Sequence, residues 1–389
     1  MSFSAEKYIS KVVNDIPPSS IRRFFDLVAE RPDAISLSIG EPDFVTPRSF
    51  CDAAVKSLQD GKTAYAPSAG IAELRSAIGV YLKKQFQLEY DYNGEILITV
   101  GGSEAIDITL RALLDPGDEI LIPDPAFVSY QPCALMAGAK AVSVPTYMEN
   151  GFKVTTEELE KYVTPKTKVL LINYPSNPTG AIMGKADLEQ LALFAQKYNL
   201  LVISDEIYGE LTYGSKHCSM ASLPGMRERT ILISGFSKAF AMTGWRVGYL
   251  CAPKALTSAI TKVHQYAIMC SPTISQYAAL EAMTNGHDEV RRMVAEYEKR
   301  RDFVVSRFQE IGLPVSNPEG AFYAFPNITK SGLSSEQFCQ QLLHDFNVAA
   351  VPGNAFGERG EGFIRCSYAT SMEKLQIALE RMERFLQSL

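Results

Sequence analysis

The sequence of 389 residues lacks most features of membrane, secreted and nucleic-acid-binding proteins. It contains no run of about 18 apolar residues, so a membrane-spanning helix is not expected. Its seven cysteines are an odd number without the paired spacing of a zinc site, which predicts free thiols in a reducing compartment. The formal net charge of -6, with dispersed lysine and arginine, argues against a nucleic-acid partner.

Short motifs that would identify other classes are missing as well. Neither GxGxxG nor GxxxxGK[ST] occurs after an apolar strand, which argues against a dinucleotide fold and a P-loop. The four histidines are scattered, and no metal site is expected. The first residues lack the basic and apolar regions of a signal peptide, so we expect a cytoplasmic protein. The length suggests roughly two to three domains.

A single lysine occupies an unusual position. Lys238 lies in a turn of small residues between two apolar runs, residues 230–234 and 247–251. An ammonium beside apolar walls loses hydration, which lowers its pKa and favours the neutral amine that forms a Schiff base. Ser237 and Arg246 would suit a phosphate ester on the same ligand. A lone loop lysine would more often be solvated, so the whole string carries the inference.

Polar residues follow several other apolar runs. Asn177 comes after the run 168–173, and Asp205 ends the run 200–204. Ligands collect at the carboxyl ends of parallel strands, where both side chains would lie, although an aspartate there is more often a turn or helix cap. Residues 102–104 (Gly102, Ser103 and Glu104) open a helix after a strand, and the free N–H groups of such a junction bind anions.

Strand-like runs alternate with helical patterns from about residue 95 to 250, which predicts an α/β fold with a mainly parallel central sheet covered by helices. An apolar stripe from Val290 to Ile311 predicts a long helix, and shorter strands around residues 320–325 and 362–367 predict a smaller α+β domain. We therefore expect three regions: an N-terminal arm with a small-domain segment (1–45), a large ligand-binding domain (46–285) and a small C-terminal domain (286–389).

Two further positions indicate a ligand. Arg365 stands in a short apolar strand, where an unpaired guanidinium is costly, so an anion is expected beside it; a structural salt bridge is the alternative. Gly40 ends a short alternating strand, residues 35–39, where the backbone can approach a ligand closely. A plain turn is the competing interpretation of Gly40.

Motifs along nearly the whole chain, from about residue 16 to the end, resemble in order those of the class I/II aminotransferases of fold type I, which use pyridoxal 5'-phosphate (PLP). The motifs are ISLSIGEPDF from Ile35, the segment from Tyr65 to Arg75, NYPSNPTG from Asn173, SDEIY from Ser204, SKAFAMTGWRVGY from Ser237 and GFIRCS from Gly362. The resemblance implies a large PLP-binding domain in which Lys238 holds PLP as an aldimine and moves the substrate Cα proton. Asp205 would keep the pyridine nitrogen protonated.

The resemblance also implies roles for the remaining positions. Asn177 and Tyr208 would bind the 3-oxygen of the ring, and Phe127 would stack on it. Gly102, Ser103, Glu104, Ser237 and Arg246 would hold the phosphate, together with Tyr65 from the partner subunit of a homodimer with shared sites. Arg365, with Gly40 and Asn177, would bind the substrate α-carboxylate.

The resemblance implies ping-pong transfer of an amino group from an L-amino acid to a 2-oxo acid, which in this family is commonly 2-oxoglutarate. In some aspartate-selective relatives, a lysine at the position of Ser103 binds the distal carboxylate of the substrate. This lysine is absent here, which favours neutral or aromatic donors and leaves aspartate as an alternative. A PLP-dependent C–S β-lyase would use the same site. A non-catalytic ligand-sensing module is a third alternative. Regulators with aminotransferase-like domains carry a DNA-binding extension, and we expect neither room for one nor a basic helix pair in this sequence.

Overall fold

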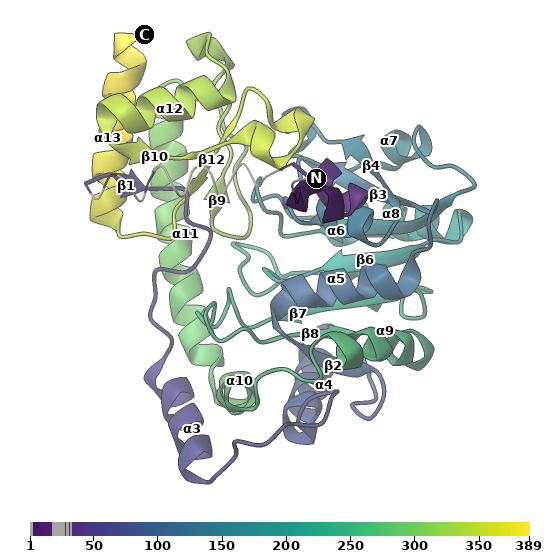
Figure 1. Cartoon of the computed structure of the whole chain (residues 1–389). Coiled ribbons are helices and arrows are strands. Elements are labelled where there is room, and N and C mark those ends of the chain that lie inside the picture. The colour runs from purple at the N-terminus through teal and green to yellow at the C-terminus, as the bar shows by residue number, and fades with distance from the viewer. Residues whose placement is uncertain (1–2, 18–27, 29–30, 32) are drawn as a thin grey trace.

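The computed structural model describes residues 3–17, 28, 31 and 33–389 (Figure 1). Much of the expected N-terminal arm, including residues 18–27, lies outside the described residues. Two short helices, η1 (Ala5–Tyr8) and α1 (Lys11–Asp15), come before strand β1 (Ile35–Ser36). None of the helices in the described part of the chain combines the length and apolar composition of a membrane span.

A seven-stranded sheet forms the centre of the larger part of the molecule. Its order is β2-β8-β7-β6-β5-β3-β4, and only β8 runs antiparallel to its neighbours. The strands are β2 (Ile96–Thr99), β3 (Glu119–Asp124), β4 (Lys140–Pro145), β5 (Thr167–Asn173), β6 (Leu201–Asp205), β7 (Thr230–Gly235) and β8 (Gly248–Cys251). The mainly parallel sheet expected from the alternating pattern is confirmed.

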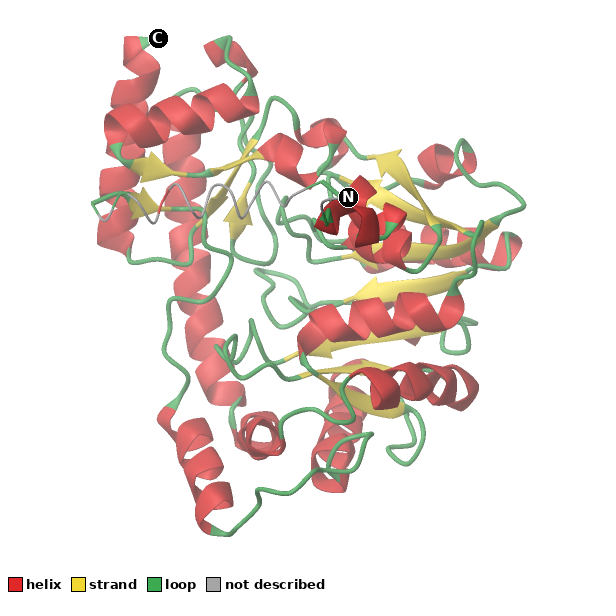
Figure 2. Cartoon of the chain, in the orientation of Figure 1, coloured by secondary structure: helices red, strands yellow, loops and turns green. Residues whose placement is uncertain are grey.

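Helices cover both faces of this sheet (Figure 2). Alternate residues of one strand enter different cores: Leu170 and Ile172 of β5 pack in one cluster, and Val169 and Leu171 in another. Burial on both faces explains why the strands read as continuous apolar runs. The helices are α3 (Arg48–Gln59), α4 (Ala72–Phe86), α5 (Gly101–Leu113), α6 (Tyr130–Met136), α7 (Thr156–Glu160), α8 (Lys185–Lys197), α9 (Lys254–Ala267) and α10 (Thr273–Asn285), with the short turns η2 (Met148–Asn150) and η3 (Met220–Ser222).

The smaller part is built on α11 (His287–Glu310), which contacts α10 near one end and α13 near the other (Figure 1). The apolar stripe that predicted this helix is confirmed. A three-stranded antiparallel sheet, β11-β12-β9, and a two-stranded parallel pair, β1-β10, lie beside it. The elements are β9 (Tyr323–Ala324), η4 (Thr329–Ser331), α12 (Ser335–Phe346), β10 (Val348–Ala349), β11 (Val351–Pro352), η5 (Gly353–Phe356), η6 (Glu358–Gly360), β12 (Ile364–Ser367) and α13 (Met372–Ser388).

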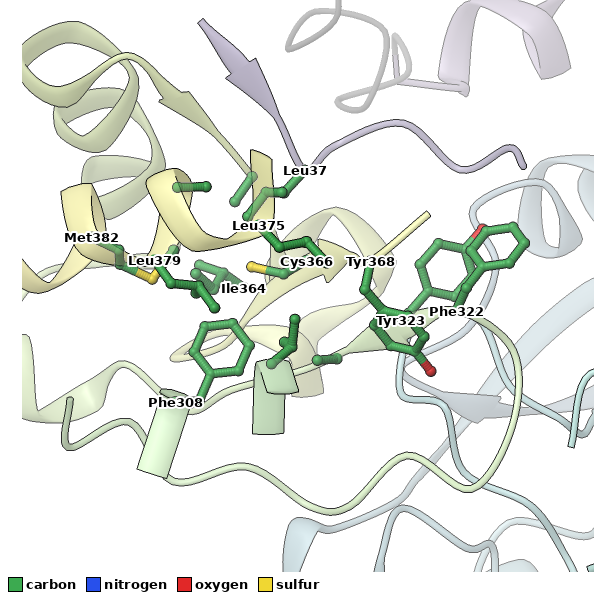
Figure 3. Packing of buried hydrophobic residues seen from close by; sticks show 14 of the residues in the cluster. Leu37, Phe308, Phe322, Tyr323, Ile364, Cys366, Tyr368, Leu375, Leu379 and Met382 are labelled. Carbon is green, nitrogen blue, oxygen red and sulfur yellow. The ribbon is translucent and has the colours of Figure 1, made fainter. Parts of the chain in front are cut away.

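The N-terminal segment joins the core of this smaller part. Leu37 is 1% exposed and packs with residues of α11, β12 and α13 (Figure 3). The strand expected over residues 320–325 is shorter in the structure, because only Tyr323 and Ala324 pair with β12. The boundaries 1–45, 46–285 and 286–389 remain a prediction; α11 begins at His287, close to the last of them.

Candidate active site

A cavity of about 700 Å³ lies at the carboxyl ends of β5 and β6, between the central sheet and the smaller part. Eleven of the residues named from the sequence line it: Gly40, Gly102, Ser103, Phe127, Asn177, Asp205, Tyr208, Ser237, Lys238, Arg246 and Arg365. Tyr130, beside Phe127, lines it as well. Two others, Glu104 and Tyr65, do not. Residues from the start, the middle and the end of the chain therefore meet in one place.

Lys238 lies in the turn after β7, three residues beyond the end of the strand at Gly235, and it lines this cavity. Its Nζ donates a hydrogen bond to the Gly40 carbonyl oxygen at 2.6 Å and lies 5.9 Å from the centre of the Tyr208 ring. Burial lowers the pKa of Lys238 to about 8, and the nearby Arg365 and Arg246 act in the same direction. The amine is therefore much closer to its neutral, nucleophilic form at neutral pH than an exposed lysine.

This lowered pKa predicts how covalent capture of PLP should depend on pH. The neutral amine is the nucleophile, so the capture rate should rise with pH and level off above about 8. Between pH 7 and 9 we expect an increase of about tenfold, measured from the absorbance of apo-protein mixed with PLP. A lysine at the ordinary value of 10.5 would instead give about a hundredfold rise without levelling, and that result would contradict the assignment.

Asp205 ends β6 and points its carboxylate at the same cavity. The Tyr130 hydroxyl donates to Oδ2 at 2.7 Å, and the Ile207 backbone N–H donates to Oδ1 at 3.1 Å. Burial raises the pKa of Asp205 to about 6, and these two hydrogen bonds oppose the rise. The group is therefore held in a fixed orientation and is mainly ionised at neutral pH, as a partner for a protonated ring nitrogen requires.

Arg365, on β12, is a buried cation with neutral partners. Its Nη1 donates to Asn177 Oδ1 at 2.9 Å and its Nη2 donates to the Ser38 carbonyl oxygen at 2.7 Å. The guanidinium lies 4.5 Å from the centre of the Tyr323 ring and 4.9 Å from that of Phe356.

No acidic side chain in the described part of the chain forms an ion pair with Arg365, and its Nε finds no hydrogen-bond partner there. Burial lowers the pKa of Arg365, which shows the desolvation that this cation bears. The structural salt bridge considered from the sequence therefore has no partner among these residues. A bound carboxylate would supply the missing charge and match the planar fork of the guanidinium.

A second group of donors suited to an anion lies at the start of α5. Gly102 and Ser103 belong to the first turn of this helix, whose free N–H groups favour negative charge. Gly101 has φ of +74°, and a Cβ there would lie 2.7 Å from Arg246 Nη2, so only glycine lets the guanidinium come this close. The donors that suit a phosphate are the amides of Gly102 and Ser103, the hydroxyls of Ser103 and Ser237, and the guanidinium of Arg246, and all four residues line the cavity.

Glu104 turns its side chain away from the cavity. Its carboxylate accepts hydrogen bonds from the Val100 backbone N–H and from Nδ1 of His264, the latter at 2.7 Å. His264 is fully buried in α9. The carboxylate thus fixes the first turn of α5 from behind, and only the backbone of Glu104 remains available for the phosphate role implied by the resemblance.

Gly40 reaches the cavity because the segment around it is anchored on both sides. On one side, the Leu37 N–H donates to the Ala349 carbonyl oxygen at 2.7 Å. On the other, Arg300 of α11, whose side chain is 7% exposed, donates Nη1 to both carboxylate oxygens of Asp43 at 2.8 and 3.0 Å. Segment 38–42, which contributes to the cavity wall, is therefore held between the β1-β10 pair and α11.

Two aromatic residues named from the sequence take different positions. Phe127 lines the cavity and meets Tyr130 edge to face, with 5.5 Å between the ring centres. Tyr65 is 82% exposed and lies away from the cavity of its own chain. The position of Tyr65 is compatible with a role toward a second subunit, which remains a prediction.

Tyr323 and Ser38 also belong to the site, although no motif in the sequence indicated a role for either. Tyr323 lines the cavity, and its hydroxyl lies 2.8 Å from that of Tyr208. In the sequence it stands inside the apolar run from Ala321 to Phe325, which reads as a buried strand. Ser38 acts through its backbone carbonyl, which no side-chain pattern can reveal.

Lys238, with its lowered pKa, lies at the edge of a parallel sheet, and the Asp205 carboxylate and a set of phosphate donors line the same cavity. Together these features define a PLP-dependent enzyme of fold type I. The residues present fit this cofactor, because they match its aldehyde, its ring nitrogen and its phosphate separately. The chain belongs to the aminotransferase class I and II family, whose model matches residues 32–382. It is therefore an aminotransferase that uses PLP.

Known proteins similar to the chain cover nearly its full length. The putative aminotransferase YugH of Bacillus subtilis is 51% identical, over 97% of this chain and 98% of that protein. An aspartate aminotransferase of Pyrococcus abyssi is 50% identical, over 95% of this chain and 96% of that protein. The crystal structure of an aromatic aminotransferase from Pyrococcus horikoshii has a TM-score of 0.90 at 48% identity, covering 94% of this chain and 99% of that one.

Proposed function

We propose that this aminotransferase takes the amino group from a neutral or aromatic L-amino acid and passes it to a 2-oxo acid, 2-oxoglutarate in the first instance, in a ping-pong reaction. PLP, when bound, supplies an electron-withdrawing ring that takes up the electron pair left when the substrate Cα–H bond breaks. The support for 2-oxoglutarate comes from the family resemblance. The seven cysteines are all free thiols, which supports the proposed cytoplasmic location.

Each residue of the site would have a separate role in this reaction. Lys238 would hold the cofactor through Nζ, and its free amine would later take up the substrate Cα proton as general base. The Asp205 carboxylate, oriented by the hydrogen bond from Tyr130, would place its negative charge beside the ring nitrogen. Arg365 would bind the α-carboxylate together with Asn177, which already accepts a hydrogen bond from Arg365. Ser103, Ser237 and Arg246 would hold the phosphate in place.

The donor preference rests on the charges of the cavity wall. In the described part of the lining, the basic residues are Lys238, Arg246 and Arg365, and each already has a role. Ile39 and Val128 add apolar surface to the wall, and the remaining acidic residue, Glu41, would repel a distal carboxylate. An aspartate side chain would thus be poorly compensated, whereas an aromatic ring would bury apolar area.

The small number of basic residues in the cavity wall also makes the 2-oxo acid acceptor harder to assign than the amino donor. The second carboxylate of 2-oxoglutarate would need neutral donors of this wall or donors from the partner subunit. Relatives of this chain include proteins named as aspartate aminotransferases and as aromatic-amino-acid aminotransferases. An acceptor screen should therefore compare 2-oxoglutarate, oxaloacetate and pyruvate at equal concentration.

A single-turnover screen of amino donors tests the proposal. Phenylalanine, tyrosine and leucine should consume the absorbance of bound PLP roughly ten times faster than aspartate, since an unpaired distal charge beside apolar residues costs more than about 1.4 kcal/mol. In a Ser103→Lys variant the aspartate rate should rise relative to phenylalanine. Faster reaction of aspartate with the unmodified enzyme would refute the donor preference, and release of pyruvate and ammonia from cystathionine would indicate the β-lyase.

We also propose a homodimer in which Tyr65 of each chain completes the phosphate site of the other. Tyr65 is 82% exposed, and Tyr266, near the end of α9, is 94% exposed, so two large aromatic side chains are uncovered in one chain. Mixing an inactive Lys238→Ala chain with an inactive Tyr65→Ala chain should restore activity, to about a quarter at equal mixing. Fully active monomers by light scattering would rule the dimer out.

A further inference from the structure

Tyr323 connects two ends of the site that the proposed roles treat separately. It is 1% exposed but lines the cavity, and its hydroxyl lies 2.8 Å from the Tyr208 hydroxyl. Its ring supports Arg365, whose guanidinium carbon lies 4.5 Å from the ring centre. One side chain therefore touches the residue expected at the cofactor ring and the residue expected at the substrate carboxylate.

The short pairing of β9 with β12 produces this arrangement. Tyr323 lies opposite Ser367, two residues after Arg365 on the neighbouring strand. Residues two apart on a strand share a face, so the Tyr323 ring and the Arg365 side chain lie on the same side of the small sheet. Gly40 packs closely against this pair, and a Cβ at this position would lie only 2.9 Å from the Tyr323 hydroxyl oxygen.

Two other buried tyrosines nearby show what a purely structural hydroxyl looks like. The Tyr368 hydroxyl donates to the Ala321 carbonyl oxygen at 3.3 Å, and the Tyr213 hydroxyl donates to the same oxygen. Neither residue lines the cavity. The Tyr368 hydroxyl also lies 3.5 Å from that of Tyr213. The Tyr323 hydroxyl differs, because its hydrogen-bond partner among the described residues is Tyr208, which faces the cavity.

The pair has a preferred direction of donation once an acceptor binds. Each phenol carries one proton, and burial raises the pKa of both Tyr208 and Tyr323, so both keep it at neutral pH. If Tyr208 donates its proton to the 3-oxygen of the cofactor, it can only accept from Tyr323. A donor that itself accepts a hydrogen bond is strengthened by cooperativity.

We propose that Tyr323 is a positioning residue of the transamination site: its hydroxyl directs the Tyr208 proton toward the cofactor, and its ring holds Arg365 in place for the α-carboxylate. This role rests on the proposed assignment of Tyr208 and Arg365. It predicts that the hydroxyl and the ring have separable effects, one on the cofactor and one on carboxylate binding.

Two variants of the holoenzyme separate these effects. In Tyr323→Phe, the pH midpoint of the absorbance change of bound PLP should rise by about 0.5 to 1 pH unit, because weaker donation from Tyr208 leaves more negative charge on the 3-oxygen. Binding of 3-phenylpropionate, a carboxylate without an amine, should stay within about twofold. In Tyr323→Leu, binding of this inhibitor should also weaken, roughly tenfold.

Tyr368→Phe is the matched control, because it removes an equally buried hydroxyl that does not line the cavity. It should leave both the midpoint and the inhibitor affinity at their unmodified values. An unmoved midpoint in Tyr323→Phe would overturn the role of the hydroxyl, and this variant should fold because the ring remains. If the unmodified protein showed no absorbance of lysine-bound PLP, the proposed function itself would fail instead.

Discussion

Replacement of Arg365 by alanine should lower kcat/KM for the preferred amino acid by roughly two to four powers of ten. The guanidinium is buried, stacks on two aromatic rings and hydrogen-bonds only neutral groups among the described residues. Removing one partner of a desolvated charged pair costs on the order of 3–5 kcal/mol, which corresponds to this loss of rate. PLP should remain bound, because Arg365 is not among the residues proposed to hold its phosphate.

Amines that lack the carboxylate provide the control for Arg365. The decarboxylated counterpart of the preferred amino acid cannot use the guanidinium, so its slow reaction should change little in the variant. The amino acid and its amine should therefore converge in reactivity. An equal fall for both, with PLP still bound, would mean that Arg365 supports the structure of the site and does not read the carboxylate.

Much of the fold could be predicted because the strand pattern is local. Val169 to Ile172 form an uninterrupted apolar run, which a strand covered on both faces requires, and polar residues mark where such strands stop. Asp205 ends β6, and Lys238 follows β7, so the edge of the sheet that carries the cavity followed from the sequence. The antiparallel direction of β8 did not, since a strand reads the same in either direction.

The remainder of the site depends on contacts between distant parts of the chain. Ser38 and Gly40 contribute carbonyl oxygens, which every residue has, and their place in the site comes from anchoring by Ala349 and Arg300. Glu104 stands in the first turn of a helix, and the sequence could not show that its side chain pairs with His264, 160 residues later. Tyr323 looks like a core aromatic because it is one; the hydroxyl decides its role.

Replacement of Asp205 by asparagine should slow Cα–H cleavage by on the order of 10²–10³. Asparagine keeps the shape and one of the two oxygens, so it can accept from Tyr130 or from the Ile207 N–H, which donate to different oxygens of Asp205. Folding and PLP capture should therefore be largely retained. The negative charge that holds the ring nitrogen protonated is lost, and with it the capacity of the ring to accept electrons. Single-turnover reaction with the preferred amino acid measures the effect directly.

Asp124 provides a matched control for Asp205 on the same sheet. It ends β3, is 4% exposed against 5% for Asp205, and burial raises its pKa to about 6 as well. The backbone of Arg359 and Glu358 opposes this rise in the pKa of Asp124, and its carboxylate does not line the cavity. Asp124→Asn should therefore react within about threefold of the unmodified enzyme, since it removes a buried charge without touching the cofactor. A half-reaction of Asp205→Asn within a factor of about two of the unmodified rate would reduce Asp205 to a structural cap of its strand.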